Sequence, residues 1–160
     1  MPDFFDDDDD NFDPEDFDFD PNDLPDDDEK DNYRELPVFK KAESIRELTR
    51  AIVDTFDKDK DKLMMRELMM ENAYIIGAKI AGASAGGFYS LRMEKAMLIK
   101  IHARELQAQT SLCKAEKLCN QEYIQLLRKE IEDFRILFIE WVRGFDKTDD
   151  LPDEWDILNL

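Results

Sequence analysis

The chain between residues 88 and 144 repeats its apolar residues at helical spacing. Two seams run through it, each with one member every seven residues, and the second seam lies three positions before the first. Residues that recur in this way form a stripe along a helix, and an apolar stripe has to be buried against other helices. The pattern therefore predicts an all-α protein. The first seam is Ile99, Leu106, Cys113, Asn120, Leu127, Phe134 and Trp141, and the second is Ala96, Ala103, Thr110, Lys117, Ile124, Ile131 and Phe138.

The two seams become polar together near the middle of this stretch, at Thr110, Lys117 and Asn120. Isolated polar residues occur in the seams of continuous helices, but neighbouring ones in both seams favour a turn. Asn120 is also a residue type that caps a new helix. We therefore predict two antiparallel helices, 88–115 and 120–144, with one continuous rod as the alternative.

Two further helices are predicted before this hairpin. Pro37 suits the first turn of a helix, and apolar residues follow it at helical spacing, which predicts a helix over 37–57. A Met-rich start and the pair Gly86-Gly87 delimit a second helix over 61–85. Together the four helices predict an antiparallel four-helix bundle over residues 36–145. We expect residues 146–160 to form an acidic extension, in which Pro152 opens a short helical turn.

The second predicted helix carries a strip of small residues, Ala78, Gly82 and Gly86, spaced four apart. Small residues let another helix approach closely, so we expect a tight helix crossing there. The alternative is a membrane-inserting hairpin through residues 73–91. Lys79 interrupts that stretch, which is barely long enough to span a bilayer, and we therefore expect no membrane insertion.

The net charge of −18 is unevenly distributed. Residues 1–36 hold 18 acidic and 2 basic residues, whereas the remaining chain holds 22 acidic and 20 basic residues. Runs of Asp repel one another and proline interrupts regular structure, so we expect residues 1–35 to form a disordered acidic tail. A surface without clustered Lys and Arg argues against direct binding of nucleic acid.

Aromatic residues alternate with carboxylates in this acidic tail. Rings can enter apolar pockets of a partner while acidic groups meet a basic rim, which is typical of a short docking motif. The alternative is a tail that only keeps the protein in solution. The C-terminal extension has a similar composition. The candidate partner-binding residues are Phe4, Phe5, Phe12, Phe17, Phe19, Trp155 and Leu158.

Residues suited to catalysis or metal binding are few. His102 is the only histidine, and Glu71, Glu94, Glu105 and Glu132 are expected to face solvent rather than line a metal site. We expect Trp141, Phe134, Phe138 and Tyr123 to belong to the core rather than to a cofactor site. Cys113 and Cys119 are expected to be free thiols. With no secretory signal at Met1, they predict a cytoplasmic protein.

The sequence thus favours a non-enzymatic protein-interaction module. The helical bundle would serve as a scaffold, and its acidic, aromatic ends would dock on a partner protein with a basic surface. No catalytic residue, metal ligand or cofactor is assigned, and self-association is allowed by the length of the seams. Two alternatives remain: a polyanionic mimic of nucleic acid that inhibits a basic protein, and a bundle that binds metal through carboxylates.

Overall fold

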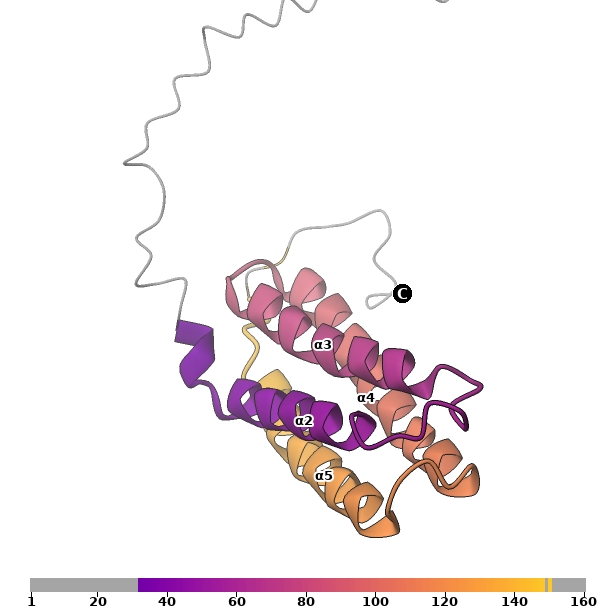
Figure 1. Ribbon diagram of the computed structural model, residues 1–160. Coiled ribbons are helices and arrows are strands. Elements are labelled where there is room, and N and C mark those ends of the chain that lie inside the picture. Colours follow the sequence, from indigo (N-terminus) through magenta and orange to yellow (C-terminus); the bar gives the residue numbers. More distant parts are fainter. Residues whose placement is uncertain (1–31, 149, 151–160) are drawn as a thin grey trace, which may run out of the picture.

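The computed structural model describes residues 32–148 and residue 150 of the chain, and in this range it consists of four α-helices and one turn of 3-10 helix (Figure 1). Helices α2 and α4 each pack against α3 and α5, so the four helices form a closed bundle. Successive helices run in opposite directions (Figure 1). The predicted antiparallel four-helix bundle is therefore confirmed. The elements are η3 (Asn32–Glu35), α2 (Pro37–Val53), α3 (Met65–Ser84), α4 (Tyr89–Ala115) and α5 (Gln121–Arg143).

The core of the bundle is built from the predicted seams together with the apolar faces of α2 and α3. Eight apolar seam residues are buried, and Ala103, Phe138 and Trp141 are half-buried at the edge of the core. Helical spacing thus identified the inward faces correctly, because removing apolar side chains from water stabilises the fold. The buried apolar seam residues are Ala96, Ile99, Leu106, Cys113, Ile124, Leu127, Ile131 and Phe134.

The break between the last two helices is also confirmed, and the residue at the turn is unusual. Lys117 adopts a left-handed conformation with φ 53°. The Leu118 N–H donates to Cys113 O at 3.1 Å, and the Lys117 N–H donates to Lys114 O at 3.3 Å. These two bonds satisfy the last carbonyls of α4 in a Schellman motif, which usually has glycine at the left-handed position. The Asn120 side chain then caps α5 by accepting from the Glu122 N–H.

The connection between the first two long helices is longer than predicted. Helix α2 stops at Val53 rather than at residue 57, and α3 begins at Met65 rather than at residue 61. The Asp61 carboxylate accepts from the N–H groups of Met65 at 2.7 Å and Arg66 at 3.0 Å. This carboxylate therefore caps α3 from outside the helix, and residues 54–64 form the connection.

The N-terminal limit of the folded region was also predicted wrongly. The expected acidic tail ran to residue 35, but Asn32–Glu35 forms η3, which packs on α2 and α3. The Tyr33 ring meets the Phe39 ring edge-on, with centroids 4.8 Å apart. This aromatic contact draws the segment before Pro37 onto the bundle. The remainder of the predicted tail, residues 1–31, lies outside the described residues.

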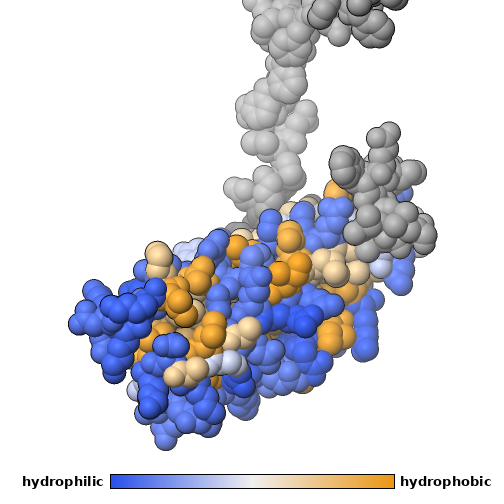
Figure 2. All heavy atoms as spheres, turned by 90° about the vertical axis from the view of Figure 1, so that its right-hand side faces the viewer, coloured by the Kyte–Doolittle hydropathy of each residue, from blue (hydrophilic) through white to orange (hydrophobic). Residues whose placement is uncertain are grey.

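Hydrophobic residues reach the surface in several patches between hydrophilic side chains (Figure 2). Tyr123, which we expected in the core, is 44% exposed, because it lies one position before the buried Ile124 and points to another side of α5. Within residues 32–148 and residue 150, no helix combines the length and apolar character needed to cross a membrane.

Candidate functional site

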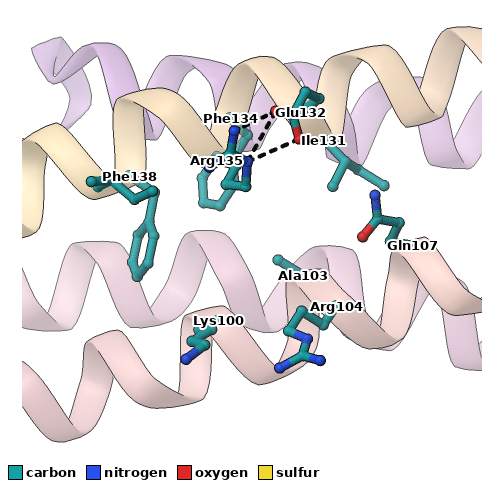
Figure 3. A pocket seen from close by; sticks show the side chains of 10 residues that line it. Lys100, Ala103, Arg104, Gln107, Ile131, Glu132, Phe134, Arg135 and Phe138 are labelled. Atoms are coloured by element: carbon teal, nitrogen blue, oxygen red, sulfur yellow. Dashed lines mark hydrogen bonds and ion pairs between the residues drawn. The ribbon is translucent and has the colours of Figure 1, made fainter.

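A groove with an apolar floor runs between α4 and α5, with a volume of about 310 Å³ (Figure 3). Its floor consists of Ala103 from α4 and of Ile131, Phe134 and Phe138 from α5. The rings of Phe134 and Phe138 are stacked, with centroids 5.8 Å apart. Because Ala103 offers only a methyl group opposite these rings, α4 leaves space that a larger seam residue would fill. We call this site the α4–α5 groove.

The rim of the α4–α5 groove is predominantly basic. Lys100, Arg104 and Gln107 stand on α4, while Glu132 and Arg135 stand on α5 (Figure 3). Arg135 is neutralised by Glu132, whose carboxylate accepts from the Arg135 Nε at 2.9 Å. The hydrogen bond from Arg135 also holds the pKa of Glu132 below its ordinary value.

Lys100 and Arg104 form no ion pair with any residue in the described part of the chain. They are one helical turn apart on α4, and like charges at that spacing repel each other. The α4 side of the groove is therefore an uncompensated positive site next to an apolar floor. Such a combination suits a ligand that is both apolar and anionic.

One end of the interface between α4 and α5 is closed by a polar bridge. Arg128 of α5 donates through Nε to the Thr110 Oγ1 at 2.7 Å, and it also donates to the Ser111 hydroxyl. The Thr110 hydroxyl in turn donates to Gln107 O at 2.6 Å. The polar seam residue Thr110 is thus fully buried but hydrogen-bonded, which explains how the core accommodates it.

The other end lies beside the segment that follows α5. The Phe145 ring packs edge-on against Trp141 at 4.8 Å, and the Arg92 guanidinium lies over the Phe145 ring at 4.1 Å. Asp150 Oδ1 accepts from the Ser90 N–H at 3.1 Å and from the Ser90 hydroxyl. These contacts hold Phe145 and Asp150 against the first turn of α4.

The only histidine of the sequence makes a contact between two helices. His102 Nδ1 lies 2.7 Å from the Asn72 Oδ1, a carbonyl oxygen that accepts the ring N–H. Glu105 approaches the same nitrogen at 3.8 Å. Asn72 is buried, so this contact satisfies a polar group between α3 and α4.

The four glutamates considered as metal ligands are all exposed. They do not converge, and within residues 32–148 and residue 150 no group of three or more His, Cys, Asp or Glu side chains could hold a metal ion. The two cysteines are free, as the structure shows for this part of the chain. The Cys113 thiol donates to the Met69 Sδ at 3.4 Å inside the core.

The strip of small residues on α3 does not form the tight helix crossing that we expected. Gly82 faces the Lys95 side chain, whose ammonium donates to Gly82 O at 2.7 Å, and Gly86 lies beyond the helix with φ 92°. Gly77, one position before this strip, faces α2, and an added Cβ there would make ordinary contact with Glu43 and Phe39. The lysine side chain occupies the space that a helix would need.

The seven candidate partner-binding residues, the five phenylalanines with Trp155 and Leu158, lie outside the described residues. The groove residues Lys100, Arg104 and Phe138 were not singled out as a site from the sequence. A signal was nevertheless present: a small seam residue, Ala103, is flanked by two cations one helical turn apart.

Comparison with known proteins gives no further assignment. No protein-family model matches this chain, and no curated protein matches it.

Proposed function

We propose that this protein is a non-enzymatic interaction module, in which the helical bundle is a scaffold and the acidic, phenylalanine-bearing N-terminal segment docks on a partner protein. The observation that carries this proposal is the position of the core within the described chain. Every buried apolar residue of the described chain lies between Val38 and Phe145, and all four helices contribute to the core.

The distribution of charge also supports a bundle that acts as a scaffold and a separate N-terminal segment that docks. Residues 37–145 contain 19 basic and 16 acidic residues, so the bundle has a small positive charge, whereas the segment before it is strongly acidic. A rigid mimic of nucleic acid would spread carboxylates over its folded surface. Here the acidic residues of the bundle are matched by cations, as in the pairs Lys129–Asp133 and Arg135–Glu132.

The phenylalanines distinguish docking from simple polyanion behaviour. An acidic segment that acts only through charge needs no aromatic residues, whereas a docking motif uses rings as anchors in apolar pockets and acids as complements to a basic rim. Five phenylalanines occur within the first 19 residues of the chain. The partner we propose therefore has apolar pockets bordered by Lys and Arg.

A deletion of residues 1–31 tests this proposal. The full-length chain and the deletion variant are immobilised and compared for retention of proteins from an extract of the cells that make the protein. We expect the deletion variant to keep the melting temperature and helical circular dichroism of the full-length chain, because no described core residue is removed. We expect it to lose one specific retained protein.

Two results would overturn the proposal. One is a deletion variant that unfolds, which would give residues 1–31 a structural role. The other is a deletion variant that stays folded and retains the same proteins as the full-length chain.

A further inference from the structure

We propose that residues 151–160 bind the α4–α5 groove of their own chain, with Trp155 against the apolar floor and the acidic side chains beside Lys100 and Arg104. This inference concerns the C-terminal segment and stands independently of the proposed role of residues 1–31. It rests on three properties of the molecule: where the described chain ends, how far the next residues can reach, and what the groove offers them.

The described chain ends beside the start of α4. Asp150 is bound to Ser90 in the first turn of α4, the helix that forms one wall of the groove. Lys147 also lies over the ring of Tyr89, at 5.8 Å from the ammonium to the ring centroid. Residue 151 therefore starts at the end of the α4–α5 pair where α4 begins and α5 has just ended.

The distance from this starting point matches the length of the segment. Ser90 and Lys100 are ten residues apart on one helix, which corresponds to about 15 Å along its axis. Trp155 follows Asp150 by five residues, and an extended chain of that length spans about 17 Å. Trp155 can thus reach the end of the groove formed by Lys100 and Phe138, and Leu158 can reach further along it.

The chemistry of the segment complements that of the groove. Residues 151–160 contain three acidic side chains, Asp153, Glu154 and Asp156, and no basic one. They also contain a tryptophan and several aliphatic residues. A dry cavity of about 150 Å³ accepts a benzene ring, so a groove of about 310 Å³ has room for the larger indole. The two unpaired cations on α4 would gain partners.

The N-terminal acidic segment is a weaker occupant for this groove. It joins the bundle through η3, which packs on α2 and α3, and that face lies opposite the α4–α5 face. Phe19 would have to cross the bundle, about 20 Å for two packed helices, on a tether of 13 residues. Trp155 follows Asp150, which is bound to α4 itself, so it reaches the groove in five residues without crossing the bundle.

Tryptophan fluorescence tests the proposal in the full-length chain. The chain has two tryptophans, so the variant Trp141→Phe leaves Trp155 as the only reporter. We expect Trp155 to emit at shorter wavelength than exposed tryptophan and to be protected from acrylamide. Reversing the charge of the rim with Lys100→Glu and Arg104→Glu should raise the acrylamide quenching constant of Trp155 several-fold. The matched control Lys58→Glu with Lys62→Glu, on exposed residues of the loop before α3, should leave it unchanged.

A zero-length cross-link identifies the contact directly. A carbodiimide joins a lysine amine to a carboxylate that touches it, so we expect Lys100 to be coupled to Asp153, Glu154 or Asp156 within one chain. Lys100→Arg keeps the charge but removes the reactive amine. It should abolish this cross-link while Trp155 stays protected, which separates loss of reactivity from loss of binding or folding.

Four results would overturn the proposal. Trp155 could be as accessible as free tryptophan in the full-length chain, or its protection could be unaffected by reversal of the rim. Protection that grows with protein concentration would assign the groove to a second copy. Cross-links from Lys100 to carboxylates of residues 1–31 would assign it to the N-terminal segment.

Discussion

The Asp150 carboxylate accepts a hydrogen bond from the Ser90 N–H, with 3.1 Å between Oδ1 and nitrogen. Ser90 belongs to the first turn of α4, and Phe88 at the cap position provides no side-chain hydrogen bond. A residue 60 positions later in the sequence therefore caps this helix. The contact holds Asp150 against the start of α4.

Removing this cap should destabilise the protein. We expect Asp150→Ala to lower the free energy of unfolding by about 1 kcal/mol, the usual cost of losing a helix N-terminal cap. Urea denaturation followed by circular dichroism measures it. Asp150→Asn keeps an acceptor oxygen and should recover most of the loss. If Asp150→Ala unfolds at the same urea concentration as the wild type, the carboxylate does not cap α4 in solution.

Replacing Lys117 with glycine should stabilise the protein. Lys117 holds φ at 53°, a conformation that costs an L-residue roughly 1 kcal/mol and glycine almost nothing. We expect Lys117→Gly to raise the melting temperature by roughly 4 °C. Lys117→Ala loses the same side chain without relieving the backbone, and it should melt with the wild type. Equal shifts in both variants would show that the side chain, and not the backbone, is responsible.

Two buried threonines should respond to the same substitution with opposite signs. The Thr49 hydroxyl is buried without a hydrogen-bond partner among the described residues, whereas the Thr110 hydroxyl binds both Arg128 and Gln107 O. Valine has the same shape as threonine. We expect Thr49→Val to stabilise the protein by about 1 kcal/mol and Thr110→Val to destabilise it by a similar amount.

Chemical denaturation of both threonine variants checks this pair, each serving as the control for the other. A loss of stability in Thr49→Val would mean that its hydroxyl has a partner, such as an ordered water. A gain in Thr110→Val would contradict the bridge to Arg128.

The two cysteines should differ in reactivity. Burial raises the pKa of the Cys113 thiol to about 12, from an ordinary value of 9.0. The thiolate is the reactive form, so at pH 8 ionisation alone slows its reaction about a thousandfold relative to an unperturbed thiol. Burial also raises the pKa of Cys119, which is only partly covered. We expect a thiol reagent to modify Cys119 in the folded protein and Cys113 only after unfolding.

The same pKa shift predicts a loss of stability in alkali. The folded state keeps the Cys113 proton more tightly than the unfolded state does. The stabilisation is therefore complete below about pH 9, and it declines as the pH rises towards 12. Cys113→Ala should flatten the difference in stability between pH 8 and pH 10. A Cys113 thiol that reacts as fast as Cys119 in the folded protein would contradict both expectations.

The sequence predicted the bundle well where a repeating pattern determined the structure. Residues such as Ile99, Leu106 and Leu127 are buried because each helix can hide only one face. Lys117 and Asn120 marked the turn because polar groups cannot continue a buried seam. The helix ends near Val53 and Met65 were missed because residues 54–64, most of them charged, are compatible with a helix. The cap from Asp61 depends on the path of the loop, which no periodicity encodes.

The α4–α5 groove could not be predicted from the sequence, for a different reason. The seams showed that Ala103 and Phe138 face inward, but not that they would stand opposite each other with unfilled space between them. That space depends on the sizes of residues from two helices at one level of the bundle. The contact between Asp150 and Ser90 is equally invisible, since it joins two segments that share no pattern.

The account rests on the claim that the N-terminal segment docks through its phenylalanines and not through charge alone. The most direct measurement is partner retention by a full-length chain in which Phe4, Phe5, Phe12, Phe17 and Phe19 are replaced with serine, so that every acidic residue remains. We expect this variant to fold like the wild type and to lose the partner at low and at high salt. Retention equal to that of the wild type at low salt, declining steeply as salt rises, would contradict the claim and identify the segment as a simple polyanion.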